Sequence, residues 1–367
     1  MFKTKDILNK TRKGKYEERM RSFGLWFSKK EEIKEDPEFS VHINFWSESV
    51  RKDQADPDLD VGIKIKDFKI IEKVVFHCPF VVEKDSITDL FPKLCVLQNA
   101  DLIFNTNGSL NNKDSYSVYS FANGTSEEKL LLFQLNHPNL EMMYNLNTQD
   151  NKTDIEFDFT KFNAVISNNS DYNDIHEVYI RFRIQSENMK NTIYFDCEPS
   201  NKSFESVFSG TRIFDFKINE KRNLGSKIIT NLELEKYHLS KINTVHLLVM
   251  EPSSYEVEAF TSEDMTCREL EGKLWDDYYT KNIDYSKGRI LAYHWKFKNG
   301  CSCLLKIKYS KTNIVALMGY IVMIVALGVV GSTIVSGIQD IFAEYFPLNA
   351  IVCGIVLFGI GLFLGKK

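Results

Sequence analysis

Two long apolar stretches near the C-terminus decide how this sequence divides. Residues 314–338 read IVALMGYIVMIVALGVVGSTIVSGI, and residues 346–364 read FPLNAIVCGIVLFGIGLFL. They contain 25 and 19 residues without a charge, and a helix of roughly 20 apolar residues crosses a bilayer core of about 30 Å. The sequence therefore predicts a two-helix transmembrane hairpin over residues 314–365.

The charges beside the hairpin predict its orientation. Lysines occur before the first stretch and after the second, whereas the connection contains Asp340 and Glu344 and neither Lys nor Arg. Positive residues beside membrane helices favour the cytoplasmic side. We therefore expect both chain termini, and the long region before the hairpin, to lie in the cytoplasm. The flanking lysines are Lys306, Lys308, Lys311, Lys366 and Lys367.

Small residues recur at intervals of four in both apolar stretches. Such spacing lets helix backbones approach closely, either within one hairpin or between chains. The alternative is a plain anchor with ordinary glycine usage. The residues expected at the packing faces are Gly328, Ser332, Ser336, Ala350, Gly354, Gly361 and Gly365.

Charge is unevenly distributed along the chain. Residues 1–30 contain ten Lys and Arg and three Asp and Glu, a net charge of +7, and residues 314–367 have no net charge. Because the whole chain has a formal net charge of −4, residues 31–313 carry −11. An acidic body disfavours broad nucleic-acid binding. The seven cysteines are scattered, which suits a reducing compartment.

The basic N-terminal segment, residues 1–36, mixes cations with aromatic residues. This composition suits an anionic membrane surface, where rings lie at the headgroup level and cations contact lipid phosphates. A nucleic-acid backbone and a merely solvated arm are the alternatives. The residues predicted to contact the membrane surface are Arg19, Arg21, Phe23, Trp26, Phe27, Lys29 and Lys30.

From residue 38 onward, apolar residues alternate with polar ones, which is typical of half-buried strands. The pattern predicts a mainly β protein with two sandwich- or barrel-like antiparallel modules, residues 37–167 and 175–310, separated by the turn-rich segment 168–174. Residues 74–83 contain Pro79 and predict an edge strand or a bulge. Further strands are expected near residues 100–104 and 290–298 and a helix over 226–237.

The sequence contains none of the catalytic motifs for which it was searched. There is no phosphate-binding GxxxxGK[ST] loop, no GxGxxG, no HExxH and no GxSxG, and the seven histidines are isolated from one another. Asp56, Asp58 and Asp60 resemble the start of a calcium loop, but Gly62 comes one place late, which favours an acidic solvated turn. We therefore expect no enzyme activity, no cofactor and no metal site.

A cationic set in the second module is the candidate ligand site. On an alternating strand, Arg181 and Arg183 share a face with Tyr179, and arginine forks beside a ring can hold a phosphate group. The alternative is a solvent-facing strand whose cations pair with acids on a neighbour. The candidate residues are Tyr179, Arg181, Arg183, Arg212, Lys217, Lys221 and Arg222.

In architecture alone, the chain resembles prokaryotic membrane effectors of anti-phage abortive-infection systems. The resemblance implies a bacterial or archaeal cell membrane, a cytosolic protein partner or signal ligand, and a homo-oligomer in which clustered hairpins perturb the bilayer. It is an analogy of layout and not of motifs. A passive membrane-anchored binding module or scaffold is the first alternative, and a membrane-anchored enzyme without a recognisable motif is the second.

Overall fold

The computed structural model confirms the mainly β class, with 47% strand in several largely antiparallel sheets and about 29% helix. Its described residues form two compact units, the first within residues 1–195, 214–253 and 259–305 and the second within residues 196–213, 254–258 and 306–367. The residues that the structure describes are 21–30, 34–53, 56–122, 128–136, 142–167, 170–197, 208–234, 236–261, 263–279, 282–286, 288–311, 314–339 and 348–365.

A five-stranded sheet in the first unit has the order β14-β1-β4-β10-β9. The strand pairs in this sheet are antiparallel. Its strands are β1 (Gly24–Lys29), β4 (Ile71–Cys78), β9 (Tyr144–Gln149), β10 (Lys152–Asp158) and β14 (His238–Leu239).

A ten-stranded sheet has the order β17-β18-β15-β2-β3-β11-β8-β7-β6, with β5 paired to β11. It is mixed, because β15 pairs parallel with β2 and β11 pairs parallel with β8. Its strands are β2 (Glu38–Trp46), β3 (Asp58–Lys66), β5 (Ile87–Asp89), β6 (Gly108–Asn112), β7 (Tyr116–Phe121), β8 (Lys129–Phe133), β11 (Glu177–Gln185), β15 (Ile242–Pro252), β17 (Met265–Glu269) and β18 (Ile290–Lys298).

A four-stranded sheet has the order β12-β13-β19-β16. Its strands are β12 (Tyr194–Cys197), β13 (Ser209–Ile218), β16 (Glu256–Phe260) and β19 (Cys301–Ser310).

The described helices are α2 (Phe91–Leu94), α3 (Leu97–Phe104), α4 (Phe159–Ile166), α5 (Met189–Thr192), α7 (Lys221–Leu224), α8 (Ser226–Leu234), α9 (Gly272–Tyr278), α10 (Ile314–Gln339) and α11 (Leu348–Gly365). The 3-10 turns are η1 (Glu48–Val50), η2 (Phe68–Ile70), η3 (Lys84–Ser86) and η4 (Ser170–Asp174).

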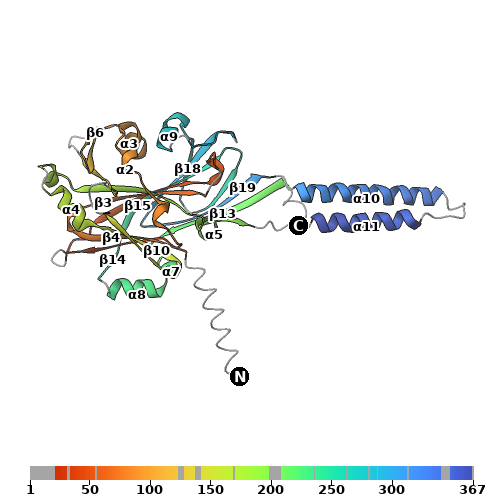
Figure 1. Ribbon diagram of the computed structural model, residues 1–367, viewed down its shortest axis with the longest axis horizontal. Coiled ribbons are helices and arrows are strands. Elements are labelled where there is room, and N and C mark those ends of the chain that lie inside the picture. Colours follow the sequence, from red (N-terminus) through yellow and green to blue (C-terminus); the bar gives the residue numbers. More distant parts are fainter. Residues whose placement is uncertain are drawn as a thin grey trace, which may run out of the picture. The chain divides into compact units, whose positions relative to one another are not determined.

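The first unit is a sandwich whose core is rich in phenylalanine. Phe76 and Phe157 of the five-stranded sheet contact Phe182 of the ten-stranded sheet, with ring centroids 5.9 and 5.4 Å apart. Helices α2, α3 and α9 lie on the outer side of the ten-stranded sheet, and α8 lies on the outer side of the five-stranded sheet (Figure 1). Both faces of the ten-stranded sheet are therefore covered, so β11 is buried on both sides.

The strand pairing does not follow the boundary predicted at residues 168–174. Strand β15 pairs with β2, and β11 pairs with β3, so strands from both predicted modules alternate in the ten-stranded sheet. A turn-rich segment marks a connection in the chain, but it does not determine which strands become neighbours.

Two local predictions were wrong. Strand β4 lies between β1 and β10 rather than at an edge, because it ends at Cys78 and leaves Pro79 outside the hydrogen-bonded ladder. Residues 100–104, predicted as a strand, belong to helix α3. Strand β18 covers the predicted residues 290–298, and α8 begins at the predicted Ser226.

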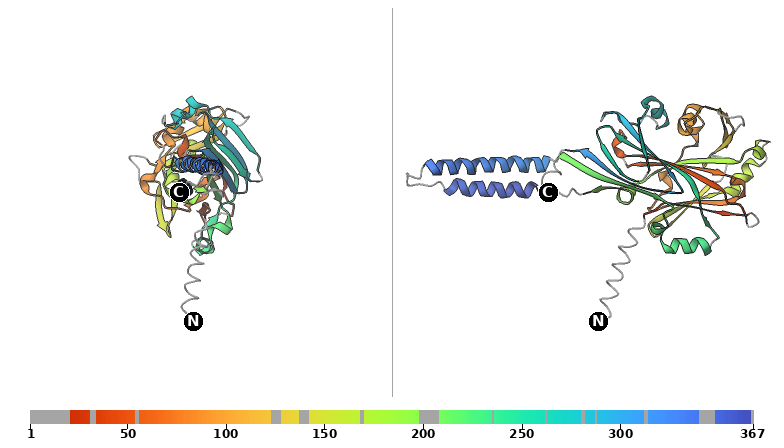
Figure 2. Two further views of the ribbon diagram at one scale, coloured as in Figure 1. Left: turned by 90° about the vertical axis from the view of Figure 1, so that its right-hand side faces the viewer. Right: turned by 180° about the vertical axis from the view of Figure 1, so that it is seen from behind.

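In the second unit, α10 and α11 lie side by side (Figure 2). Residues Leu317–Ile334 of α10 are long and apolar enough to cross a membrane, and 17% of this stretch is buried. Within α11, the apolar helical stretch Gly354–Phe363 is shorter. A crossing by both helices therefore remains a prediction.

Candidate functional site

Two aspartates and three arginines lie together on the outer side of the ten-stranded sheet. Antiparallel pairing places Arg183 of β11 opposite Asp60 of β3, with Asp58 two residues away on β3. Arg181 is 1% exposed and Asp60 is fully buried. Arg51 follows η1. We call these residues, with Tyr179, Tyr278 and Tyr279, the charged cluster.

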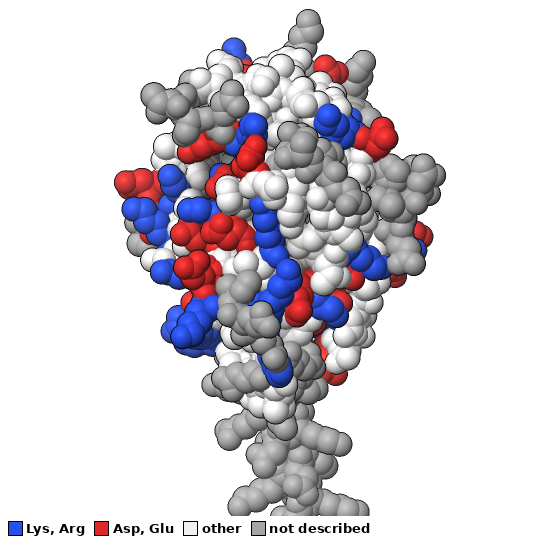
Figure 3. Space-filling view, turned by 90° about the vertical axis from the view of Figure 1, so that its left-hand side faces the viewer, with Lys and Arg blue, Asp and Glu red and all other residues white. Residues whose placement is uncertain are grey.

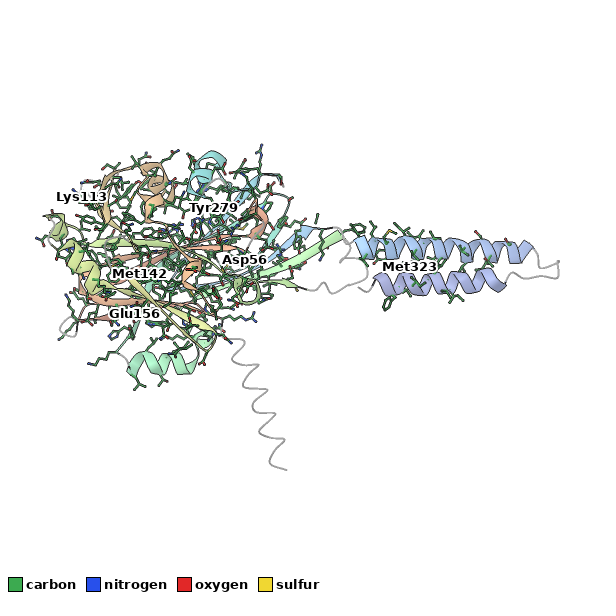
Figure 4. All side chains as sticks on the ribbon, in the orientation of Figure 1. Asp56, Lys113, Met142, Glu156, Tyr279 and Met323 are labelled. Carbon is green, nitrogen blue, oxygen red and sulfur yellow. The ribbon has the colours of Figure 1, made fainter. Side chains whose placement is uncertain are left out.

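Arginine guanidinium groups and tyrosine hydroxyls donate hydrogen bonds to both carboxylates of the charged cluster. Arg183 donates from Nε and Nη2 to the two oxygens of Asp60, at 2.5 and 3.0 Å. The Tyr278 hydroxyl, at the end of α9, donates to Asp60 Oδ2 at 2.9 Å and accepts from Arg181 Nε at 2.8 Å. Asp58 accepts from Arg51 Nη1 at 2.7 Å and from the Tyr279 hydroxyl, and Figure 4 labels Tyr279.

Burial and the neighbouring charges shift the pKa values of the two aspartates in opposite directions. Burial acts to raise the pKa of Asp60, but the charges of Arg183 and Arg181 and the hydrogen bonds from Arg183 and Tyr278 outweigh it, so this pKa lies below its usual value. Burial dominates at Asp58 and raises its pKa, against the opposing charges of Arg183 and Arg51. Asp60 is therefore the carboxylate that the arginines hold ionised most firmly.

The charged cluster corrects two interpretations of the sequence. Asp58 and Asp60 lie in a buried strand and not in a solvated turn, because α9 covers this side of the sheet. Arg181 and Arg183 do pair with acids on the neighbouring strand, but neither faces solvent freely. Since their donors already bind tyrosine and aspartate, a phosphate ligand would have to displace these partners.

The structure brings together three of the seven predicted ligand residues, namely Tyr179, Arg181 and Arg183. Arg212 lies in the second unit, where its Nε donates to Asp196 at 3.0 Å. The other three lie on β13 and α7 and have other partners or none within the described residues: Lys217 binds Asp215, Arg222 binds Glu220, and Lys221 is exposed.

Three histidines that are isolated in the sequence form a row on the ten-stranded sheet. His246 lies opposite His42 in the parallel pair of β15 with β2. Its Nδ1 is 3.1 Å from Nε2 of His294 on β18, and these two rings are stacked. Sequence reasoning missed this histidine row because the strands that carry it are about 50 and 200 residues apart.

The histidine row meets the charged cluster at Tyr179. Arg181 Nη1 donates to the Tyr179 hydroxyl at 2.8 Å, so the hydroxyl proton is free to point to His42 Nδ1 at 3.2 Å. Burial lowers the pKa of His42 well below its usual value, and the charges of His246 and Arg181 lower it further.

Gly62 makes room for this junction. A Cβ at Gly62 would overlap the Tyr179 hydroxyl and come within 3.0 Å of Arg181 Nη1. A glycine in the interior of a strand often marks such a close approach. It is the one local signal in the sequence that points to this place in the sheet.

A second buried imidazole lies on the five-stranded sheet. His77 Nδ1 is 2.6 Å from Asp154 Oδ1, and Nε2 of His77 is buried without a hydrogen-bond partner. The neighbouring Cys78 points to the opposite side of β4, and burial raises the pKa of its thiol well above its usual value. A carboxylate-oriented histidine resembles part of a catalytic triad, but no nucleophile is hydrogen-bonded to it.

The aromatic residues of the predicted membrane-surface arm belong to the β core. Phe23, Trp26 and Phe27 are 0%, 4% and 2% exposed, because β1 is an inner strand of the five-stranded sheet. These rings therefore cannot lie at a membrane surface in this structure. Of the predicted cations, Arg21 donates to the Thr192 carbonyl, Lys29 pairs with Asp36, and Lys30 donates to the Lys69 carbonyl. Arg19 lies outside the described residues.

The predicted small-residue faces of the hairpin differ in their surroundings. On α11, a Cβ at Gly354 would overlap Val330, and one at Gly361 would come within 2.9 Å of the Gly319 carbonyl oxygen and Met323 Cβ (Met323 is labelled in Figure 4). On α10, Gly328 has nothing within 4 Å of a Cβ position, and Ser332 and Ser336 are exposed. Side-chain surroundings of Ala350 and Gly365 lie outside the description.

The described residues contain no group of three or more His, Cys, Asp or Glu side chains placed to hold a metal ion. On the face drawn in Figure 3, Lys and Arg side chains are interspersed with Asp and Glu. The net negative charge of residues 31–313 still argues against broad nucleic-acid binding by this region.

No protein-family model matches the sequence. No curated protein matches it either. Among solved structures, the comparison finds the Fcho1 Mu homology domain of Danio rerio with bound Eps15 peptide, which is 10% identical over 80% of this chain and 82% of that chain, with a TM-score of 0.12. At this TM-score the two backbones do not share a demonstrable fold, so no functional argument follows.

Proposed function

We propose that this protein is a membrane-anchored, non-enzymatic sensor or effector of a prokaryotic cell membrane. In this proposal α10 and α11 form a transmembrane hairpin, and the β region binds a signal or a protein partner in the cytoplasm. Binding promotes clustering of hairpins, and the clusters perturb the bilayer.

The exposed apolar surface of α10 is the observation that carries the anchoring part. A core helix of a soluble protein is mostly buried, whereas only 17% of Leu317–Ile334 is buried. Large apolar side chains such as Ile314 and Ile324 are 70% and 66% exposed. Such a surface is stable in lipid and unfavourable in water.

The uncovered face of α10 supports clustering. Gly328, Ser332 and Ser336 leave one side of α10 without bulky side chains, and α11 does not occupy it. Backbones of neighbouring hairpins could approach closely there. Since these helices contain no Asp, Glu, Lys, Arg or His, several hairpins would have to assemble before they enclosed a polar path.

A passive anchored scaffold is the second candidate, and one observation favours it. Gly354 and Gly361 already pack closely against α10 within a single chain. Part of the glycine content is thereby explained without any contact between chains.

Replacing residues 314–365 by an unrelated two-helix anchor separates the two candidates. Cells would express the full chain together with its partner or trigger, and membrane potential and viability would be followed. An effector loses its effect on exchange of the hairpin, whereas a scaffold keeps its function. Unchanged potential and viability with the native hairpin would rule out the effector.

A substitution on the uncovered face tests clustering more finely. Gly328→Leu adds a bulky side chain where α11 does not reach, so the single hairpin should form normally while clusters, measured by cross-linking in membranes, decrease. Gly359→Leu is the matched control, because Gly359 on α11 also has nothing within 4 Å of its Cβ position. Equal clustering in both variants and the wild type would contradict the proposed face.

A further inference from the structure

We infer that the second unit carries a binding surface for the phosphate groups of anionic lipids, at the point where the chain enters α10. This surface, which we call the collar, consists of Phe208, Arg212, Tyr255, Lys308, Tyr309 and Lys311, all within the second unit. The inference rests on the proposed membrane anchoring and assigns to it a lipid class.

Two lysines of the collar form no ion pair with a described acidic residue. Lys308 and Lys311 are exposed, and neither has an acidic partner among the residues that the structure describes. Lys306, two residues earlier on β19, instead lies 3.9 Å from Glu258. The two unpaired ammonium groups are therefore the ones nearest the helix, and they are available to an external anion.

An aromatic stack forms around Tyr309, which lies between the two lysines in the chain. The Arg212 guanidinium lies over the Tyr309 ring at 4.6 Å, and the Tyr255 and Tyr309 rings are stacked with centroids 5.4 Å apart. A Cβ at Gly210 would overlap the Tyr309 ring, so glycine allows the ring to lie against β13. Tyrosine suits the membrane interface because its ring is apolar and its hydroxyl is polar.

Phe208 is the apolar part of the collar. Its side chain is 60% exposed, and its carbonyl accepts the Lys311 N–H at 3.0 Å. This hydrogen bond holds an exposed ring next to a cation three residues before α10 begins. In water that exposure is unfavourable, whereas at the boundary between headgroups and acyl chains both groups find a suitable environment.

The position of the collar matches the headgroup layer. If α10 begins at the edge of the hydrocarbon core, Lys311 lies within the headgroup layer, which is roughly 5–8 Å thick on each side. Lys308 comes about 10 Å earlier along β19 at the usual strand rise, which is close to one Debye length from the surface. The attraction of each lysine to an anionic surface corresponds to roughly a fivefold gain in affinity.

Lipid titration of the full chain in detergent, followed by native mass spectrometry, tests the collar. Phosphatidylglycerol and phosphatidylcholine with the same acyl chains are added separately. We expect tighter binding of phosphatidylglycerol, and we expect Lys308→Gln with Lys311→Gln to reduce that preference by roughly tenfold or more. Lys296→Gln with Lys298→Gln is the matched control, because these exposed lysines of β18 lie in the first unit. An unchanged preference in the collar variant would overturn the inference.

A second pair of variants tests the contribution of Phe208 to the collar. Phe208→Ser should weaken binding of both lipids by a similar factor, whereas Phe260→Ser, which removes a ring that is 53% exposed elsewhere, should not. Equal effects of the two variants would remove Phe208 from the collar.

Flotation with phosphatidylcholine vesicles keeps the two proposals distinguishable. A chain that fails to float with neutral vesicles contradicts the membrane anchor. A chain that floats with them and shows no preference for phosphatidylglycerol contradicts the collar alone.

Discussion

In the interior of the first unit, the Arg183 guanidinium donates two hydrogen bonds to the Asp60 carboxylate, from Nε at 2.5 Å and from Nη2 at 3.0 Å. This pair belongs to the charged cluster and not to an open ligand site. The cluster holds β3 to β11 and, through Tyr278, fixes the end of α9 to both strands.

Asp60→Asn should destabilise the protein by about 3–5 kcal/mol, because it removes the carboxylate that the buried Arg181 and Arg183 share and leaves Asp58, 3.8 Å from Arg183, as the remaining acid. Urea unfolding of the full chain in detergent, followed by tryptophan fluorescence, measures this loss, since all four tryptophans precede the hairpin. Glu220→Gln is the control. It breaks the pair with Arg222, whose side chain is 88% exposed, and should cost about 1 kcal/mol or less. Equal costs for the two variants would show that the cluster adds nothing specific.

The histidine row should make the protein less stable in mild acid. Burial and the neighbouring charges of His294 and Lys296 lower the pKa of His246 to about 4, whereas an unfolded histidine titrates near 6.5. Between about pH 6.5 and 4 the unfolded state therefore binds protons that the folded state does not. Stability falls as pH falls through this window, by at most about 1.4 kcal/mol per pH unit for each histidine.

His246→Gln should flatten that pH dependence. The unfolding free energy is measured at intervals from pH 7 to pH 4.5 for the variant and the wild type, so the contributions of other groups cancel in the comparison. His176→Gln, which removes an imidazole that is 65% exposed and lies outside the histidine row, is the control variant. A slope that stays the same in His246→Gln would contradict this role of the histidine row.

Gly361→Ala should loosen the hairpin, because the new Cβ comes within 2.9 Å of the Gly319 carbonyl on α10. The measurement uses Val330→Cys with Gly354→Cys in a Cys353→Ala background. The Cβ positions of residues 330 and 354 are 3.6 Å apart, which suits a disulfide. Disulfide formation should slow with Gly361→Ala and keep its rate with Gly359→Ala, where nothing lies within 4 Å. Identical rates would mean that the two helices do not pack through Gly361.

Phe23→Ala tests the reassignment of the predicted arm to the core. Phe23 is fully buried and contacts Phe76 and Phe216, with ring centroids 5.5 and 5.0 Å apart. The substitution should lower the free energy of unfolding by about 3–5 kcal/mol and leave flotation with vesicles unchanged. Lys30→Gln should change neither quantity by much. A stable Phe23→Ala protein that no longer floats would restore the membrane-surface interpretation.

Strand positions could be predicted from the sequence wherever one face is apolar. Strand β18 alternates between polar and apolar residues from His294 to Lys298, and its bounds match the predicted residues 290–298. Helix α3 was missed because its short apolar run at residues 100–104 fits a strand equally well, and a run of that length does not separate the two.

Neighbouring strands could not be predicted, and the candidate site depends on them. The pairing of β15 with β2 brings His246 beside His42, although about 200 residues separate them. The pairing of β3 with β11 likewise joins Asp60 to Arg183. Only Gly62 gave a local sign that side chains from elsewhere lie against the strand.

The parallel pair of β2 and β15 also sets the order of events during synthesis. Strand β2 leaves the ribosome early, but it has no β15 partner until residue 252 has been made, and β18 is complete only at residue 298. At 5–20 residues per second, residues 299–365 follow within roughly 3–13 s. Long-range β pairing takes milliseconds to seconds, so closure of the central sheet and synthesis of the hairpin fall on overlapping timescales. If the hairpin enters a membrane as proposed, delayed insertion would expose it beside any strand edges that are still unpaired.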